Sequence, residues 1–392
     1  MMKRLLSAAA ILLLAACASS PNGDTSSAKA NNPEADKNET RHYRVDAGPN
    51  AVGAIPLATL RDAARNKELE MSIEYPTKAG PHPLIIFSHG FGGSSRGYVG
   101  LSSYWASYGY VVIKPTHADS GTAQTLREAA EVWETQTAAD HRNRVQDVRF
   151  IIDSIDALEA KYPELKGKID RERIGVGGHS YGALTAVMIA GAKTFEQSGA
   201  SSRQTDARVD AIVAMSPQGP EANIGLTEQS WDEIQIPALF MTGTGDRGPG
   251  GREPSWRREP FERAAAGDKW FISIPGAQHF SFAGRQLDQR ALDVTRKRGR
   301  NEPETLPTPV DPNDPNPGIP SNDPRRNPDP MIRQRQRSPR DAMAMYEQQK
   351  AVFENIKISS LAFWETYLRK EDEGRKYLES LRTRNGWDVA TR

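Results

Sequence analysis

Gly178-His179-Ser180-Tyr181-Gly182 follows the apolar or small residues 174–177 and precedes the helix-compatible run 183–190. This order predicts a strand, a tight turn and a helix, which is the setting of a nucleophile elbow. Glycine at both ends of the pentapeptide removes side chains that would collide with a strained turn. We therefore expect Ser180 to stand exposed above a sheet, with the backbone N–H of Tyr181 beside it.

Strand-like and helix-like patterns alternate along the rest of the chain. We expect strands over 69–75, 83–88, 110–113, 173–177, 209–215, 238–242 and 270–274, and helices over 98–108, 145–158, 183–190 and 341–368, with weaker helical character over 126–133. Alternation of this kind predicts an α/β fold with a mostly parallel central sheet and helices on both faces.

A serine is a weak nucleophile and needs a base from elsewhere in the chain. His279 is the only one of the seven histidines that follows Ser180, and it comes just after the expected strand 270–274. Asp246 follows the strand 238–242, so the order is serine, acid, histidine. We expect His279 to take the Ser180 proton and Asp246 to orient the imidazole.

Two other aspartates compete with Asp246 for the role of the acid. Asp268 precedes its strand and would lie at the wrong edge of the sheet, and Asp288 follows the histidine. Asp246 is therefore the expected catalytic acid.

The turn His89-Gly90-Phe91-Gly92-Gly93 ends the expected strand 83–88. Ester cleavage develops negative charge on the carbonyl oxygen, which preorganised donors must stabilise. We expect the backbone N–H groups of Phe91 and Tyr181 to form this oxyanion hole, and His89 to shape the turn.

Several other residues admit both a structural and a functional interpretation. His179 is expected to pack structurally beside the nucleophile. His117 and Asp119 could form a metal pair, but no third ligand has motif spacing, so a structural or pocket-edge role is favoured and no metal is expected. The tryptophans that could line a cleft, but are individually more typical of core or surface anchors, are Trp133, Trp231 and Trp256.

The N-terminus has the pattern of a targeting segment. Lys3-Arg4 precedes the short apolar run 5–16, and Leu14-Ala15-Ala16-Cys17 resembles the lipobox of bacterial lipoproteins. We expect residues 1–16 to be a lipoprotein signal peptide, Cys17 to be lipidated, and residues 17–45 to form a flexible tether. Ala18 after the cysteine suggests the outer membrane of the cell envelope. An ordinary signal peptide with an incidental cysteine is the alternative.

The composition shifts between residues 296 and 340, where proline alternates with Asn, Asp and Arg. Such a segment cannot bury a core, and we expect a disordered or extended insertion within a domain that spans 46–392. A nucleic-acid-binding tail is disfavoured because acids interrupt the arginines, and the net charge of +1 gives no reason to expect nucleic acid. Binding of an anionic envelope surface is a further alternative.

The strings that carry a family resemblance are PLIIFSHGFGG from Pro83, YVVIKPTHADS from Tyr110, RIGVGGHSYGA from Arg173, IPALFMTGTGD from Ile236 and GAQHFSF from Gly276. Over residues 69–285 and 341–370 the chain resembles the α/β-hydrolase superfamily. It is most similar to predicted dienelactone hydrolases and their platelet-activating-factor acetylhydrolase, chlorophyllase and polyester-hydrolase relatives.

The resemblance implies hydrolysis of a small-molecule or lipid ester without a metal or organic cofactor. The resemblance also implies that Ser180, Asp246 and His279 form the catalytic triad and that Phe91 and Tyr181 are the oxyanion donors. True dienelactone hydrolases use a cysteine nucleophile, whereas this chain has serine at position 180 and its sole cysteine in the lipobox. An envelope-anchored serine esterase is thus the expectation. The alternatives are acyl transfer or amide hydrolysis by the same residues, and a non-catalytic envelope-binding lipoprotein.

Overall fold

The computed structural model describes residues 43–121, 138–196, 198–284 and 339–392. Several predictions concern residues that lie outside these ranges. They are the signal segment 1–16, Cys17, the tether 17–45 apart from its last residues, the helix 126–133 with Trp133, Asp288, and nearly all of the insertion 296–340.

A central sheet organises the described residues, and its strand order is β1-β2-β4-β3-β5-β8-β9-β10-β11. The strands from β4 to β10 in this order are parallel, while β1, β2 and β11 pair antiparallel with their neighbours at the two edges. The bounds are Val52–Asp62 (β1), Lys67–Pro76 (β2), His82–Ser88 (β3), Val111–Pro115 (β4), Ile169–His179 (β5), Ala211–Met215 (β8), Ala238–Gly245 (β9), Lys269–Gln278 (β10) and Asp388–Thr391 (β11). The predicted mostly parallel sheet of an α/β protein is confirmed.

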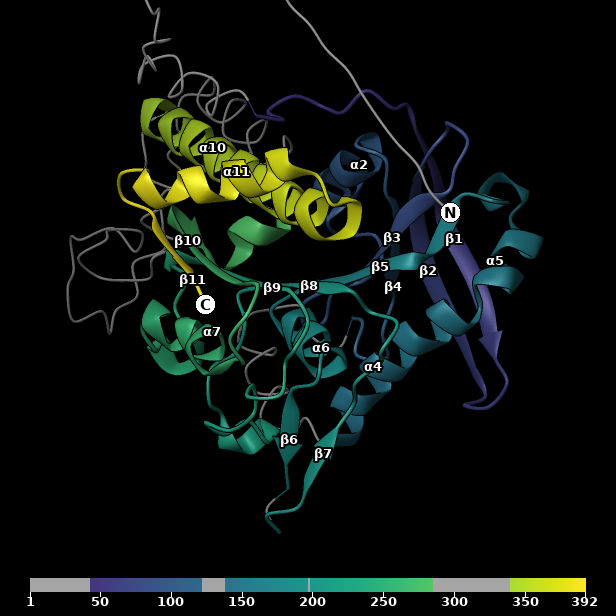
Figure 1. Ribbon diagram of the computed structural model, residues 1–392, viewed down its shortest axis with the longest axis horizontal. Coiled ribbons are helices and arrows are strands. Elements are labelled where there is room, and N and C mark those ends of the chain that lie inside the picture. Colours follow the sequence, from purple (N-terminus) through teal and green to yellow (C-terminus); the bar gives the residue numbers. More distant parts are fainter. Residues whose placement is uncertain (1–42, 122–137, 197, 285–338) are drawn as a thin grey trace, which may run out of the picture. The chain divides into compact units, whose positions relative to one another are not determined.

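Helices cover both faces of this sheet (Figure 1). On one face lie α2 (Val99–Ser107), α10 (Pro339–Trp364) and α11 (Asp372–Ser380), and on the other lie α4 (Ala138–Asp153), α5 (Ile155–Lys161), α6 (Tyr181–Ile189) and α7 (Glu259–Arg263). A small hairpin of β6 (Lys193–Phe195) and β7 (Ser201–Arg203) stands apart from the sheet.

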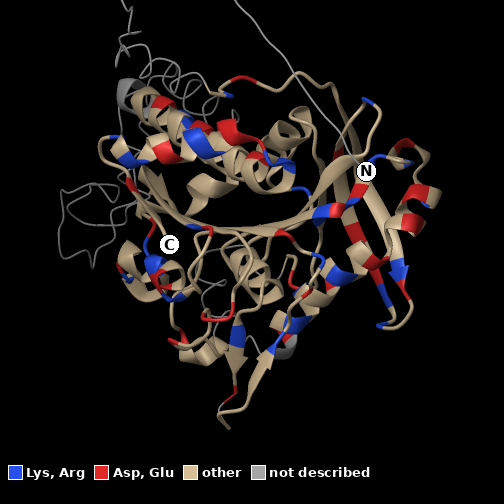
Figure 2. Cartoon of the chain, in the orientation of Figure 1, with Lys and Arg blue, Asp and Glu red and all other residues tan. Residues whose placement is uncertain are grey.

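Strand β3 shows why the two layers of helices are needed. Its Leu84 and Ile86 belong to the apolar cluster on the α4–α6 face, whereas Ile85 and Phe87 belong to the cluster on the α2–α10 face. All four side chains are buried, and each such burial contributes about 1.5–3 kcal/mol. Figure 2 is consistent with this, because most of the charged residues lie on the helices, loops and outer strands and few lie on the central strands.

Some element boundaries differ from the sequence-based expectation. The single helix expected over 145–158 is two helices, α4 and α5, which are separated at Ser154. The edge strands β1 and β11 were not predicted from the pattern. β1 contains Pro56, and its pairing with β2 shifts register between Ile55 and Ala58, so this proline lies at a bulge as strand prolines commonly do.

The helix expected after the Pro-rich segment is present as α10 and packs directly on the sheet. Gly175 of β5 makes this approach possible, because a Cβ atom at this position would lie 2.7 Å from the Trp364 ring. Trp364 itself is fully buried. Among the described residues, no helix combines the length and the apolar character that a bilayer crossing requires.

Candidate active site

Ser180 lies in the turn between β5 and α6 in a strained backbone conformation. Its φ is 56° and its ψ is −116°, a region that residues with a side chain rarely adopt. The two glycines of the motif are sterically required. A Cβ atom at Gly178 would lie 2.1 Å from the Gly182 carbonyl oxygen, and one at Gly182 would lie 1.9 Å from the Ser88 carbonyl oxygen.

The fold brings Ser180, His279 and Asp246 together from the ends of three strands. His279 Nε2 lies 3.0 Å from Ser180 Oγ, and His279 Nδ1 lies 3.0 Å from Asp246 Oδ1. A carboxylate only accepts, so Nδ1–H donates to Asp246 and Nε2 is left to accept the serine proton. Asp268 directly precedes β10 and so lies, as expected, at the end of the sheet where the parallel strands begin. There Tyr367 donates a hydrogen bond to it.

Asp246 is fully buried and ionised. Burial alone would raise the pKa of this carboxyl group, but the Arg257 charge and the hydrogen bond from His279 outweigh it and lower the pKa to about 2. The second carboxylate oxygen accepts hydrogen bonds from the hydroxyl groups of Ser216 and Thr242. Both oxygens of the Asp246 carboxylate therefore accept hydrogen bonds.

Arg257 contacts Asp246 from within the core, a role that sequence reasoning missed. Its Nε lies 3.0 Å from Asp246 Oδ1, and its guanidinium donates to the backbone carbonyls of Ser216, Pro217, Asp246 and Arg247. The side chain is buried, so these acceptors replace water. Arg257 ties the end of β9 to the segment after β8.

The turn that carries His279 is fixed from the helix that follows the Pro-rich segment. Gln278 and Ser281 form a reciprocal capping box around His279. Ser281 Oγ donates to Gln349 Oε1 of α10 at 2.9 Å. Residues far apart in sequence thus determine where this imidazole stands.

His179 connects the two sides of the site. Tyr98 Oη accepts a hydrogen bond from the Gly90 N–H at 3.1 Å and donates to His179 Nδ1 at 2.8 Å. His179 Nε2–H in turn donates to the His279 carbonyl oxygen at 2.8 Å. Burial lowers the pKa of His179 well below its usual range, so the ring is neutral. The structural role expected for His179 therefore includes these hydrogen bonds to Tyr98 and to the His279 backbone.

Phe91 and Tyr181, the two expected oxyanion donors, have side-chain rings whose centroids lie 5.8 Å apart. Tyr181 is the first residue of α6. Burial raises the pKa of the Tyr181 phenol, whose oxygen lies 2.8 Å from His141 Nδ1.

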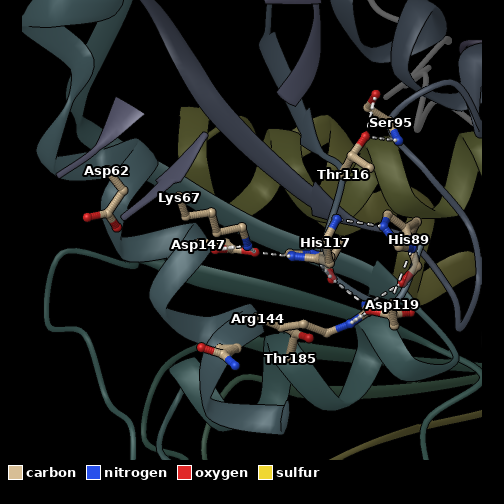
Figure 3. Close-up of polar contacts among 12 residues, drawn as sticks. Asp62, Lys67, His89, Ser95, Thr116, His117, Asp119, Arg144, Asp147 and Thr185 are labelled. Atoms are coloured by element: carbon tan, nitrogen blue, oxygen red, sulfur yellow. Dashed lines mark hydrogen bonds and ion pairs between the residues drawn. The ribbon is translucent and has the colours of Figure 1, made fainter. Parts of the chain in front are cut away.

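A second set of serine, histidine and aspartate adjoins the 89–93 turn, and Figure 3 shows its His117 between His89 and Asp147. His117 Nε2 is 2.9 Å from Ser88 Oγ, and His117 Nδ1 is 2.8 Å from Asp147 Oδ2. Lys67 and Arg65 also donate to Asp147. The expected structural role of His117 is consistent with this burial, and the described residues contain no cluster of histidine, cysteine or acidic side chains that could hold a metal ion.

Sequence reasoning missed Asp147 and its neighbour Arg144, although a signal was present. Residues 144, 147, 148 and 151 recur at the spacing of one helix face, and this face is buried with the apolar Val148 and Ile151 on it. Charged residues on an apolar helix face are rare unless they are paired. Of the tryptophans, Trp231 is buried in the core, and Trp256 donates from Nε1 to the Pro220 carbonyl oxygen.

Residues 58–147 match the family model of platelet-activating factor acetylhydrolase, isoform II. Similar proteins include the platelet-activating factor acetylhydrolases of Canis lupus familiaris (28% identical, covering 27% of this chain and 31% of the relative), Cavia porcellus (28%, covering 29% and 33%) and Bos taurus (27%, covering 27% and 31%). The chain thus spans about a third of the length of these relatives. The resemblance to this esterase group that the sequence indicated is confirmed over these residues.

Proposed function

We propose that this protein is a serine carboxylic-ester hydrolase with an α/β-hydrolase fold. The observation that carries the proposal is the hydrogen-bonded chain Ser180–His279–Asp246, whose serine has the strained backbone φ of 56°. The strand order supports the fold assignment, because the serine follows β5, the acid follows β9 and the histidine follows β10. Similarity to acetylhydrolases supports the ester as the bond that is cleaved.

In the first half of the reaction, Ser180 Oγ attacks the ester carbonyl carbon and its proton passes to His279 Nε2. The carbonyl oxygen becomes an oxyanion that accepts hydrogen bonds from the Phe91 and Tyr181 N–H groups. The tetrahedral intermediate then collapses, and His279 gives the proton to the departing alcohol oxygen. Asp246 stays ionised throughout and stabilises the imidazolium.

In the second half, water attacks the acyl-serine. His279 takes a proton from this water, the oxyanion forms again in the same hole, and Ser180 regains the proton as the carboxylic acid leaves. No metal and no organic cofactor enters this sequence of steps. We propose a lipid or small-molecule ester with a short acyl group as the substrate, since the relatives are named as acetylhydrolases.

The proposed reaction is tested with protein lacking residues 1–17 and a series of p-nitrophenyl esters and phospholipids of increasing acyl length. Wild-type protein is expected to release p-nitrophenol from the acetyl ester, and Ser180→Ala to release none above the uncatalysed rate. Equal activity of the two proteins would contradict the proposal.

We further propose that Cys17 carries a lipid anchor that holds the enzyme in the cell envelope, at the outer membrane. The apolar run 5–16 and the Leu14-Ala15-Ala16-Cys17 string support this proposal. Cys17→Ser is expected to leave an unprocessed precursor of higher mass that does not incorporate a labelled fatty acid. Normal processing and labelling of the variant would contradict it.

A further inference from the structure

Arg144 of α4 is buried, and its side chain reaches toward Asp119 and His89 (Figure 3). Its guanidinium donates to both carboxylate oxygens of Asp119, at 2.9 and 2.7 Å. The remaining donors reach Ser88 Oγ at 3.1 Å, the His89 carbonyl oxygen at 2.6 Å and the Gly90 carbonyl oxygen at 3.5 Å. All five N–H groups of the side chain are therefore engaged.

The Gly90 carbonyl determines where the Phe91 N–H points, because the two groups belong to one peptide unit. In a planar trans peptide the C=O and the N–H point in opposite directions. His89 Nδ1 lies 2.7 Å from the Gly90 oxygen and the Gly93 N–H donates to it at 3.0 Å, on the side from which Arg144 also approaches. Holding this oxygen toward the interior aims the Phe91 N–H the other way.

The tautomer of His89 is fixed by its second nitrogen. His89 Nε2 accepts a hydrogen bond from the His117 backbone N–H at 3.1 Å, so the proton resides on Nδ1 and is donated to Gly90. Burial, followed by the nearby Arg144 charge, lowers the pKa of His89 well below its usual range and keeps the ring neutral.

Arg144 contacts the second expected oxyanion donor as well. Its guanidinium carbon lies 4.0 Å from the centroid of the Tyr181 ring, in cation–π contact with the first residue of α6. On the opposite side, Asp119 Oδ2 accepts the Gly92 N–H at 3.0 Å. The Arg144–Asp119 pair therefore contacts the 89–93 turn on both sides of Phe91 in the sequence, and it contacts Tyr181 as well.

We infer that Arg144 is a positioning residue that fixes the two backbone donors of the oxyanion hole relative to each other. The inference rests on the proposed ester hydrolysis. Arg144 acts through the peptides that it holds, since its own N–H groups are engaged within the protein. A lysine would keep the positive charge, but its single nitrogen cannot donate in the several fixed directions of a planar guanidinium.

The test compares Arg144→Lys and Arg144→Gln with wild-type protein in kcat, in KM and in inhibition by an alkyl trifluoromethyl ketone, which forms a tetrahedral oxyanion on the serine. The alcohol product serves as the ground-state ligand. Arg208→Lys is the matched control, because Arg208 makes the same two-pronged contact to Asp206 and otherwise donates to Asp153, without a hydrogen bond to the triad or to the 89–93 turn. Circular dichroism and thermal melts establish that each variant is folded.

Both Arg144 variants are expected to lose about 10²-fold in kcat with KM changed less than about threefold. Affinity for the trifluoromethyl ketone should fall by a similar factor while affinity for the alcohol is kept, and Arg208→Lys should behave as wild type. If Arg144→Lys has the same kcat and the same ketone affinity as the wild-type protein, the inference is overturned. Loss of alcohol binding in proportion to ketone binding would also overturn it, because a collapsed pocket would then explain the defect.

If Arg144→Lys does not fold, Asp119→Asn replaces it, with Asp206→Asn as its control. The amide keeps the shape of the side chain but removes one charged oxygen from Arg144 and Gly92. A loss of at least about tenfold in kcat and in ketone affinity is expected, and unchanged values would overturn the inference. Wild-type protein that hydrolyses no ester would overturn the proposed function as well, whereas an active wild type with an active variant contradicts only the positioning role.

Discussion

Two sets of serine, histidine and aspartate in this protein have nearly equal hydrogen-bond geometry. The distances are 3.0 and 3.0 Å in Ser180–His279–Asp246, and 2.9 and 2.8 Å in Ser88–His117–Asp147. The difference between them lies in what surrounds the serine. Hydrogen-bond distances alone therefore do not identify a nucleophile.

Access separates the two serines first. Ser88 is completely buried at the end of β3, and His117 beside it is buried too. Ser180 is only partly buried, and 28% of the His279 side chain is exposed. Ser180 and His279 therefore both expose part of their surface, whereas Ser88 exposes none.

The state of the serine oxygen separates them further. Ser88 Oγ accepts a hydrogen bond from Arg144, so a lone pair that would attack is already occupied by a cationic donor. Ser180 stands instead at the start of α6, next to backbone N–H groups that can stabilise an oxyanion. Under the proposed function, similar residues would thus carry out a reaction in one place, while in the other they hold the 89–93 turn through Arg144.

Replacement of each serine by alanine is expected to give the largest contrast. Ser180→Ala should lower kcat by about 10⁶-fold because the nucleophile is lost. Ser88→Ala removes only one of the contacts of Arg144 and should lower kcat by less than about tenfold. Initial rates with p-nitrophenyl acetate measure both. A Ser88→Ala protein that is folded but as inactive as Ser180→Ala would break the distinction.

The two aspartates should separate activity from stability. Asp246→Asn is expected to lower kcat by about 10⁴-fold, because the amide favours the wrong imidazole tautomer. Asp147→Asn should mainly lower the free energy of unfolding, by about 1–3 kcal/mol, because Lys67 and His117 lose a charged acceptor. Urea denaturation and steady-state kinetics on the same samples compare them. A stable but inactive Asp147→Asn would contradict this assignment.

The buried histidine of the second set should make the fold sensitive to acid. Burial and the Arg144 charge lower the pKa of His117 to about 4, whereas the unfolded chain titrates near 6.5. The unfolded state binds the proton first as the pH falls, so His117 costs stability progressively between about pH 6.5 and pH 4. The loss from this one group is about 3 kcal/mol.

His117→Gln is the variant that isolates this contribution. Its free energy of unfolding should depend less steeply on pH in the same window, by up to about 1.4 kcal/mol per pH unit. The remaining slope would come from the other buried histidines with lowered pKa values, His89, His141 and His179, and near pH 4 also from the aspartates with lowered pKa values, Asp119, Asp147 and Asp246. Denaturant titrations between pH 4 and pH 7 measure the slope, and an unchanged slope would refute the contribution of His117.

The sequence predicted the parts of the fold that local pattern controls. The parallel strands, the helix that follows the elbow and the helix after the Pro-rich segment could be read from apolar periodicity and glycine positions. The edge strands β1 and β11 could not, because one is interrupted by Pro56 and the other spans only Asp388–Thr391. Edge strands bury less apolar surface, so their pattern is weak.

Ser180, Asp246 and His279 could be placed because each follows a strand in a fixed order, and the fold does bring them together. Arg144, Asp147 and Arg257 could not be assigned a role in the same way. Their roles depend on contacts to residues up to 82 positions away, such as the Arg65–Asp147 pair, and no local motif records such contacts. Paired charges inside a core are a tertiary property.

Covalent labelling tests most directly which of the two serines is the nucleophile. Native protein is treated with a fluorophosphonate probe, digested, and mapped by mass spectrometry. The probe is expected on the peptide that contains Ser180, in proportion to the loss of esterase activity, with Ser88 unmodified. A probe on Ser88, or full loss of activity with Ser180 unmodified, would contradict the assignment of Ser180 as the nucleophile.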